Sequence, residues 1–332
     1  MFRRIRIPFL IDVFRINSPH EIRSVSNDDQ LDRDFKVKGP LFNQMLVRRL
    51  RKTLNVDGVP LPSIAPRHSQ SRVDEQQQLM ARLTPDSFEH YFNLPAFAAL
   101  SDFVEGKQSR PAGELTQEFI GQLFSERYVA DRETWAAAQL LDAAVRTKNP
   151  LRRLYWAITG KIKNAQQTLA RAVNGDLSGV HATGVAVHTL LVSLERLETI
   201  YRDETLRSTL TPAAASARAL VAPNSVLRQS NGGYLHNIGP LFDGTLVILN
   251  TRDGGYRSLD PRVMFLRDSW SSCPAHQLVP ALLIELWKRA KKHSLADTES
   301  ASKIEKDLKT PNKETDQNST LPFVRTNEPA HG

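Results

Sequence analysis

The segment from Val180 to about Tyr201 constrains the fold more than any other part of the chain. Apolar or small residues recur in it at helical spacing, at positions 180, 184, 187, 191, 194 and 197, and Leu190 widens the apolar stripe. Polar residues appear on its flanks only towards its end. A helix that is apolar around most of its first half has to be buried among other elements. The sequence therefore predicts an interior helix.

The remaining segments predict a mainly α fold with a small β portion. Ser18 is an N-cap residue, Pro19 stands at the first helical position and Glu21 follows three residues after the cap, which predicts a helix from 19 to about 27. Further helices are expected at 72–83, 116–124, 133–146, 151–173 and 212–221, strands at 12–16 and 245–249, and an irregular connection at 57–67. Gly232-Gly233 and Asp243-Gly244 are expected to form turns.

Composition divides the chain near residue 293. Up to that point the sequence is that of an ordinary globular protein, with 40% hydrophobic and 24% charged residues over the whole chain. Beyond it, Lys, Glu, Asp, Ser, Thr and Asn dominate and large apolar groups are few. We therefore expect one domain over 1–292 and a disordered polar tail over 293–332.

The formal net charge of +8 raises the question of a nucleic-acid partner. The arginines are scattered and are not interleaved with aromatic residues, as stacking platforms for bases require, so we expect no nucleic-acid binding. A solvated basic surface is the favoured interpretation. Such a surface can also attract an acidic protein partner or anionic lipid.

A cytoplasmic protein is expected. One cysteine excludes an intrachain disulfide framework and agrees with a reducing compartment. The basic and then apolar N-terminus is interrupted by Asp12 and Arg15 too early for a signal peptide. By composition, no stretch approaches the roughly 20 apolar residues of a membrane span.

The single cysteine, Cys273, lies in Ser-Ser-Cys-Pro-Ala-His, just before a helix-like run at 277–290. A thiolate at a turn that opens a helix is stabilised by the helix N-terminus. Such a group can act as a nucleophile or as an axial ligand to heme iron. A buried cysteine that acts only as a small apolar side chain is the alternative.

Four local patterns occur in the order found in the cytochrome P450 (heme-thiolate) superfamily, which this chain resembles. The first is a strand and helix from Val13 to Arg33, and the second is His68-x-x-x-Arg72, similar to a family motif whose two side chains hold heme propionates. The third, 215–228, is similar to the family's helix K, its following proline and a propionate-binding arginine, Arg228. The fourth runs from Gly244 to the Cys-Pro turn at Cys273.

The resemblance implies a shortened, mainly helical fold of this family that binds heme b, with Cys273 as the iron ligand. It implies that His68, Arg72, Arg228 and Arg218 serve the cofactor, and charge-assisted bonds from cations to carboxylates are physically suited to that role. In oxygen-activating members the long helix carries an acid followed by threonine. Here His188 and Thr189 stand nearest to that pair and are the predicted catalytic residues.

The implied activity is a heme-thiolate oxidoreductase acting on an apolar, fatty-acid-like small molecule. It would be a monooxygenase served by an acidic redox partner protein. Alternatively, since the acid–threonine pair is altered, it would be an enzyme that uses peroxides or rearranges hydroperoxides.

Several residues depart from the family pattern. Ala215 replaces the glutamate that pairs with Arg218, Ser271 replaces an arginine and Ser269 a glycine before the cysteine, and Phe265 is displaced by one place. A degenerate, non-catalytic heme-binding or scaffold protein is therefore an open alternative. A cysteine hydrolase with His276 as base is a third, although the sequence has no glycine-rich oxyanion signal. His181 lies seven residues before His188, which also leaves a two-histidine metal site to consider.

Overall fold

The computed structural model describes residues 2–147, 149–235, 239–258 and 260–309. It divides the chain into two units, Met1–Lys291 and Lys292–Gly332. The first unit holds all the features discussed below, and the single functional domain expected over 1–292 stays a prediction.

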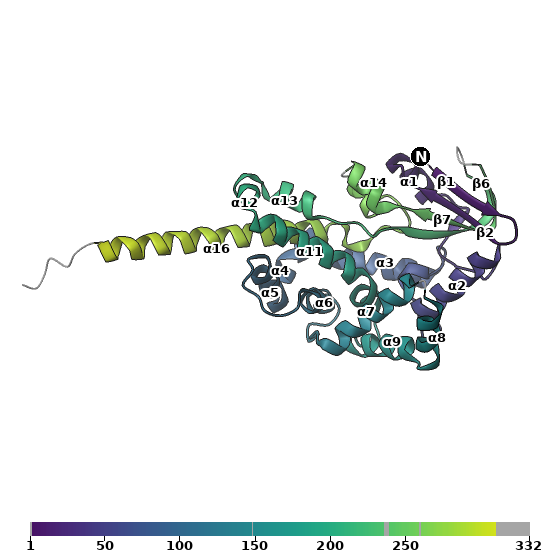
Figure 1. Cartoon of the computed structure of the whole chain (residues 1–332), viewed down its shortest axis with the longest axis horizontal. Helices are drawn as coiled ribbons and strands as arrows, with labels where there is room; N and C mark the ends of the chain where they lie inside the picture. Colours follow the sequence, from purple (N-terminus) through teal and green to yellow (C-terminus); the bar gives the residue numbers. More distant parts are fainter. Residues whose placement is uncertain (1, 148, 236–238, 259, 310–332) are drawn as a thin grey trace, which may run out of the picture. The chain divides into compact units, whose positions relative to one another are not determined.

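A five-stranded sheet and many helices make up the first unit (Figure 1). The sheet has the order β1-β2-β7-β6-β3, with β2 parallel to β7 and the other pairs antiparallel. Its strands are β1 (Phe2–Ile7), β2 (Ile11–Ile16), β3 (Leu31–Asp32), β6 (Val226–Leu235) and β7 (Gly239–Leu249). A small hairpin pairs β4 (Asn55–Val56) with β5 (Val59–Pro60). The strands expected at 12–16 and 245–249 are both present.

Two pairs of residues expected to form turns lie inside strands instead. Gly232-Gly233 belongs to β6 and Asp243-Gly244 to β7, and Asn231 is paired with Asp243 across the ladder. The glycines adopt positive φ, at +88° and +121° for the first pair and +79° for Gly244, and the register shifts between Gln229 and Asn231. The glycines therefore bend a continuous hairpin rather than end it. Residues 236–238, between the strands, lie outside the described residues.

The helices occur in most of the places where the sequence pattern predicts them, with several additions and one division. The described α-helices are α1 (Pro19–Ser26), α2 (Leu41–Leu54), α3 (Gln70–Arg82), α4 (Phe88–Phe92), α5 (Pro95–Val104), α6 (Ala112–Gln122), α7 (Arg132–Arg146), α8 (Pro150–Ile158), α9 (Lys161–Ala172), α10 (Leu177–His181), α11 (Val187–Arg202), α12 (Glu204–Thr209), α13 (Pro212–Ala219), α14 (Thr251–Ser258), α15 (Pro261–Met264) and α16 (Leu278–Lys309). Short 3-10 turns are η1 (Pro62–Ile64), η2 (Pro85–Ser87) and η4 (Pro274–His276). The helices that were not predicted include α2, α12, α14 and α15. The single helix predicted at 151–173 is divided into α8 and α9 at Gly160, whose φ is +66°.

The predicted interior helix runs from 177 to 202 as α10, the π-helical turn η3 (Ala182–Ala186) and α11. Val187, Leu194 and Leu197 are fully buried, and α11 packs against α5, α6 and α13. By length and composition it is also the one described helix that reaches the apolarity of a membrane span, and half of its most apolar window is buried in the protein.

A polar side chain from a neighbouring helix supports the π-helical turn. Gln117 of α6 is fully buried, and its amide donates to the carbonyl oxygens of Thr183 and Thr134 at 3.1 and 3.0 Å. The wider turn disturbs the usual i→i−4 pattern, and these bonds satisfy a carbonyl group inside it. The local widening of the helix thus depends on α6.

The segment predicted as a disordered tail differs in its first part. The structure continues α16 as a helix to Lys309, and its sequence from 294 is rich in Ala, Glu, Lys and Leu, which favour helix. Residues 310–332 lie outside the described residues.

Candidate functional site

Cys273 lies where the sequence predicted, at the N-cap position of η4 and just before α16. Its backbone N–H donates to the carbonyl oxygen of Phe265 at 2.9 Å, which fixes the loop. Burial raises the pKa of the thiol, while a hydrogen bond from the Ala275 backbone and the charge of Arg72 act in the opposite direction. The thiol is therefore half-buried in a site that offers a hydrogen bond and a cation to its sulfur.

Three buried arginines gather beside the cysteine loop, and we call them the arginine cluster: Arg33, Arg72 and Arg228. They are only 7%, 6% and 1% exposed. Arg33 follows β3, Arg72 lies on α3 and Arg228 on β6, so three separate elements supply them. The Arg228 guanidinium donates to the Ser271 hydroxyl, which brings the cluster to the cysteine loop.

A hydrogen bond also joins α3 to the loop. The Gln76 amide donates to the carbonyl oxygen of Ser272 at 3.1 Å. Since Arg72 lies one turn earlier on the same helix, this bond holds Arg72 near Cys273.

The described carboxylates near the arginine cluster do not balance its positive charge. Within the described part of the chain, five of its guanidinium nitrogens are buried without a hydrogen-bond partner: Nε and Nη2 of Arg33, Nε and Nη1 of Arg72, and Nε of Arg228. Burial lowers the pKa of all three arginines, and for Arg33 the charges of Arg228 and Arg72 lower the pKa further. Unpaired buried donors of one sign are costly and favour an anion among them.

Asp32 is the carboxylate whose charge opposes these shifts at Arg33 and Arg228. Its Oδ1 already accepts the backbone N–H groups of Arg33, Asp34 and Arg67, at 2.6, 3.1 and 2.8 Å. Arg72 lies 3.8 Å from Glu75, whose other oxygen accepts the Ser178 hydroxyl. Both carboxylates are thus partly engaged elsewhere.

Trp270 of the cysteine loop lies within this group of cations. The guanidinium carbons of Arg33, Arg228 and Arg67 are 4.7, 5.0 and 5.3 Å from its ring centroid. Each distance is within the range of a cation–π contact. The indole therefore positions the guanidinium groups without neutralising them.

His181, at the start of the π-helical turn, is close enough to the cluster to be affected by its charge. Burial lowers its pKa to about 4, and the charges of Arg33 and Arg72 contribute to the shift. Its Nδ1 is buried and has no hydrogen-bond partner among the described residues. At neutral pH this side chain is uncharged.

The other predicted residues make no described contact with the arginine cluster. His68 is exposed in the turn before α3, and Arg218 is exposed on α13 while Ala215, where the family pattern has glutamate, is fully buried. His188 points to α7, where its Nε2 bonds to the Ala138 carbonyl oxygen at 3.1 Å and its ring lies 5.2 Å from that of Trp135.

For Thr189 the described bond is through its main chain. Its carbonyl oxygen accepts the Ser193 hydroxyl at 3.2 Å. The catalytic roles of His188 and Thr189, and the cofactor roles of His68 and Arg218, stay predictions.

Two further groups bear on the alternatives. Nδ1 of His276 is hydrogen-bonded at 3.0 Å to the backbone carbonyl oxygen of Cys273, so this nitrogen is not available to the thiol. Together with the raised thiol pKa, this disfavours a cysteine nucleophile. Among the described residues, no group of three or more His, Cys, Asp or Glu side chains is placed to hold a metal ion.

Sequence reasoning missed Arg33 and Trp270. Arg33 stands in the charged run Asp28–Asp34, which is typical of a solvated segment. The one available signal is that it follows directly after the buried strand residue Leu31 and Asp32.

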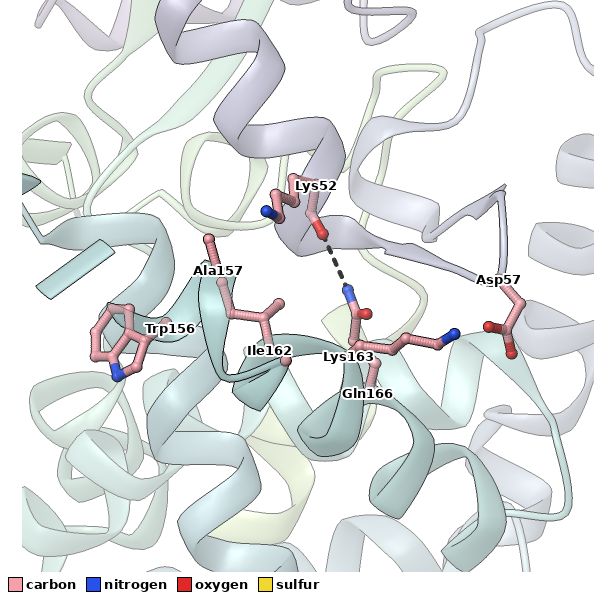
Figure 2. Close-up of a pocket in the computed structure, with 8 residues that line it drawn as sticks. Lys52, Asp57, Trp156, Ala157, Ile162, Lys163 and Gln166 are labelled. Carbon is pink, nitrogen blue, oxygen red and sulfur yellow. Dashed lines mark hydrogen bonds between the residues drawn. The ribbon is translucent and has the colours of Figure 1, made fainter. Parts of the chain in front are cut away.

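A separate cavity of about 390 Å³ lies between the end of α2, α8 and α9 (Figure 2). It is lined by Lys52, Asp57, Trp156, Ala157, Gly160, Ile162, Lys163 and Gln166. The Gln166 amide donates to the Lys52 carbonyl oxygen at 3.2 Å across it. None of the arginine cluster lines it, so it is not part of the candidate site.

No protein-family model and no curated protein matches the sequence. Solved structures do. A cytochrome P450 OleT variant in complex with arachidonic acid shares 9% identity at a TM-score of 0.58, over 84% of this chain and 80% of that one. Cytochrome P450 CYP152N1 with myristic acid shares 11% at 0.57, over 84% and 80%. CYP154A1 from Streptomyces coelicolor A3(2) shares 12% at 0.56, over 86% and 85%.

Proposed function

Since the chain has the cytochrome P450 fold, we propose that it is a heme-thiolate oxidoreductase. The observation that supports this best is the arginine cluster beside Cys273. Heme is a largely apolar group with two carboxylates, so its site would need cations for the carboxylates and a side chain that can ligate iron. Buried guanidinium donors without described partners are suited to such carboxylates.

Cys273 is the proposed iron ligand. Burial disfavours the thiolate of the free sulfur, and a bound metal cation would offset that penalty. The Ala275 backbone hydrogen bond and the charge of Arg72 stabilise the ligated sulfur further. When bound, heme b would supply the redox-active iron that oxygen chemistry requires.

Arg72 and Arg228 are proposed to bind the heme carboxylates, as the sequence resemblance implied. We add Arg33, because it is about as buried as Arg72 and lies close enough to Arg72 and Arg228 for their charges to lower its pKa, after burial itself. Arg33 would take over the role of the arginine that the family pattern has at the position of Ser271. Trp270 would hold Arg33 and Arg228 in place through its ring.

The proposed substrate is an apolar small molecule resembling a fatty acid. Two neighbours in fold were solved with arachidonic acid and myristic acid, which supports this class. Whether the oxidant is dioxygen or a peroxide follows from the distal residues, for which His188 and Thr189 are the sequence's candidates. An acidic redox partner belongs to the dioxygen variant, and a cytoplasmic location fits both.

A non-catalytic heme-binding or scaffold protein is the second candidate, and a specific observation favours it. Arg218 is exposed and lacks the glutamate partner of the family pattern, since position 215 is an alanine, which is fully buried. The loop before Cys273 has also lost its arginine. The fold can thus persist while the machinery for catalysis is lost.

The test is an absorption spectrum of the protein expressed with added heme, reduced and exposed to carbon monoxide. A long-wavelength, thiolate-type Soret band that Cys273→Ala abolishes and Ser272→Ala retains is the expected result. Bound heme without that band would mean that another residue ligates the iron. A protein that binds no heme in either form would overturn the proposal and leave the scaffold.

A further inference from the structure

The positive charge of this chain is concentrated in three stretches of sequence. Residues 1–11, 35–56 and 143–175 hold 16 of its 44 basic residues and none of its 36 acidic residues. The rest of the chain therefore has 28 basic and 36 acidic groups and is net negative by 8. A net charge of +8 thus describes a polarised molecule rather than an evenly basic one.

The three stretches are neighbours in the fold. At the tip of the β1–β2 hairpin, the carbonyl oxygens of Phe9 and Leu10 accept the N–H groups of Leu41 and Phe42, both at 2.9 Å, where α2 begins. Further along α2, Arg49 donates to the Ala144 carbonyl oxygen at 2.9 Å. Lys52 of α2 and Trp156 of α8 line the same cavity (Figure 2), so the second and third stretches are also neighbours there.

The helix α8 carries an apolar stripe on the outside of the protein. Leu151, Leu154, Tyr155 and Ile158 have the spacing of one helix face, and all four are exposed, Leu151 by 74% and Ile158 by 76%. The opposite face is anchored by the buried Trp156. An apolar helix face without a described partner marks an interaction site.

Cations surround this stripe. Arg152 and Lys161 extend over the rings of Trp156 and Tyr155, at 4.8 and 4.9 Å from the ring centroids. Burial lowers the pKa of Arg49 on α2, and the nearby charge of Arg153 lowers the pKa of Arg49 further. Arg48 and Lys163 are exposed on α2 and α9.

At the other end of α2 the surface is again apolar. Phe9 is 91% exposed, and it adopts a φ of +62°, in the left-handed region that large side chains rarely occupy. Leu41, Phe42 and Met45 are exposed beside it. A strained backbone that presents an aromatic side chain to solvent is hard to explain by stability alone.

We propose that this surface binds peripherally to a membrane with anionic lipids, with α8 lying in the interface. Short helices with exposed apolar residues on one side and arginines and lysines around them bind such interfaces through both burial and charge. A second copy of the chain is not favoured, since two like-charged faces would repel each other. Nor is nucleic acid favoured, because the exposed groups between the cations are mainly aliphatic.

The experiment is co-sedimentation of the full chain with vesicles of phosphatidylcholine alone or mixed equally with phosphatidylserine. We expect binding to the mixed vesicles only, weakened by salt. Leu151→Gln/Ile158→Gln should lower the partition coefficient about tenfold. Arg48→Gln/Lys163→Gln should lower it by about fivefold for each cation removed.

Two matched controls change exposed residues that lie outside the proposed membrane-binding surface. Arg127→Gln/Arg132→Gln removes two exposed cations at the other end of α7, and Val129→Gln removes an exposed apolar group there. Both should bind as the unchanged protein does. The proposal fails if the unchanged protein ignores anionic vesicles at low salt, if Leu151→Gln/Ile158→Gln binds normally, or if the controls weaken binding equally.

Discussion

The guanidinium of Arg228 donates a hydrogen bond to the hydroxyl of Ser271, two residues before Cys273. One residue comes from a strand of the sheet and the other from the cysteine loop, and they are 43 residues apart in sequence. In the family pattern the position of Ser271 holds a second cation. Here a hydroxyl takes that place, and the described carboxylates do not neutralise the arginine.

We first predict opposite effects of Ser271→Arg with and without heme. A fourth guanidinium beside Arg33, Arg72 and Arg228 should destabilise the heme-free protein by about 2–4 kcal/mol, because the new charge is buried among like charges. With heme carboxylates present it should slow heme loss to a heme acceptor. Ser271→Gln is the control for side-chain length. Equal destabilisation of both forms would mean that the loop does not face a bound anion.

Arg33→Met should make the heme-free protein more stable. The change removes a buried cation with two unpartnered nitrogens and keeps much of its volume, so a gain of about 1–3 kcal/mol in the free energy of unfolding is expected. It should also weaken heme binding. The measurement is urea unfolding of the heme-free form, together with heme titration.

The matched control is Arg110→Met. Arg110 bonds to the buried Glu118 at 2.8 Å, and this bond is the main cause that raises its pKa. Its loss should destabilise the protein, since Glu118 is left without its cation. If both arginine variants lose stability, Arg33 has a structural role only.

The cluster shows which parts of the site were visible in the sequence. Arg72, Arg228 and Cys273 belong to ordered local patterns, so the sequence named them as candidates; the structure brings them together, and their roles stay predictions. Arg33 was not named, because its burial depends on Trp270, which is more than 200 residues away and comes next to it only in the folded chain. Local composition cannot report such a contact.

The same limit applies to the helices. The interior helix was predicted because its own apolar pattern requires burial, whereas its π-helical turn depends on Gln117 from another helix and has no local signal. The α2 helix was missed although Asn43, Val47, Leu50 and Leu54 follow helical spacing and are buried. There the signal was present, since these positions recur every three or four residues.

Ala215→Glu should not restore the family's ion pair. Ala215 is fully buried in α13, which packs on α11, and Arg218 is exposed on the same helix. A carboxylate there would be buried without a cation and should cost about 3 kcal/mol or more. Ala213→Glu, on the exposed side of α13, is the control and should change stability by less than about 0.5 kcal/mol.

Circular dichroism during thermal unfolding would measure both variants. A stable Ala215→Glu protein with improved heme retention would contradict the expectation. It would show that the helix can rotate to pair the two side chains.

The last prediction concerns pH. His181 has an ordinary pKa of 6.5, and in the folded protein burial and the arginine cluster lower it to about 4. Between these two values the unfolded chain binds more protons at this position than the folded chain does. The contribution of His181 to the free energy of unfolding is therefore fully present above pH 6.5. It is lost as the pH falls from 6.5 to about 4, by up to about 3 kcal/mol.

His181→Asn should remove this part of the pH dependence, while the exposed His68→Asn should leave it in place. The free energy of unfolding of the three proteins is measured at the two ends of this pH range. Arg33 and Arg72 stay charged throughout, and the carboxylate of Glu75, near Arg72, is common to all three proteins, so the difference isolates His181. Heme carboxylates would neutralise the arginine cluster and raise the pKa of His181, so bound heme should narrow the pH range over which His181 reduces stability. If heme leaves this pH range unchanged, its carboxylates bind away from the arginine cluster.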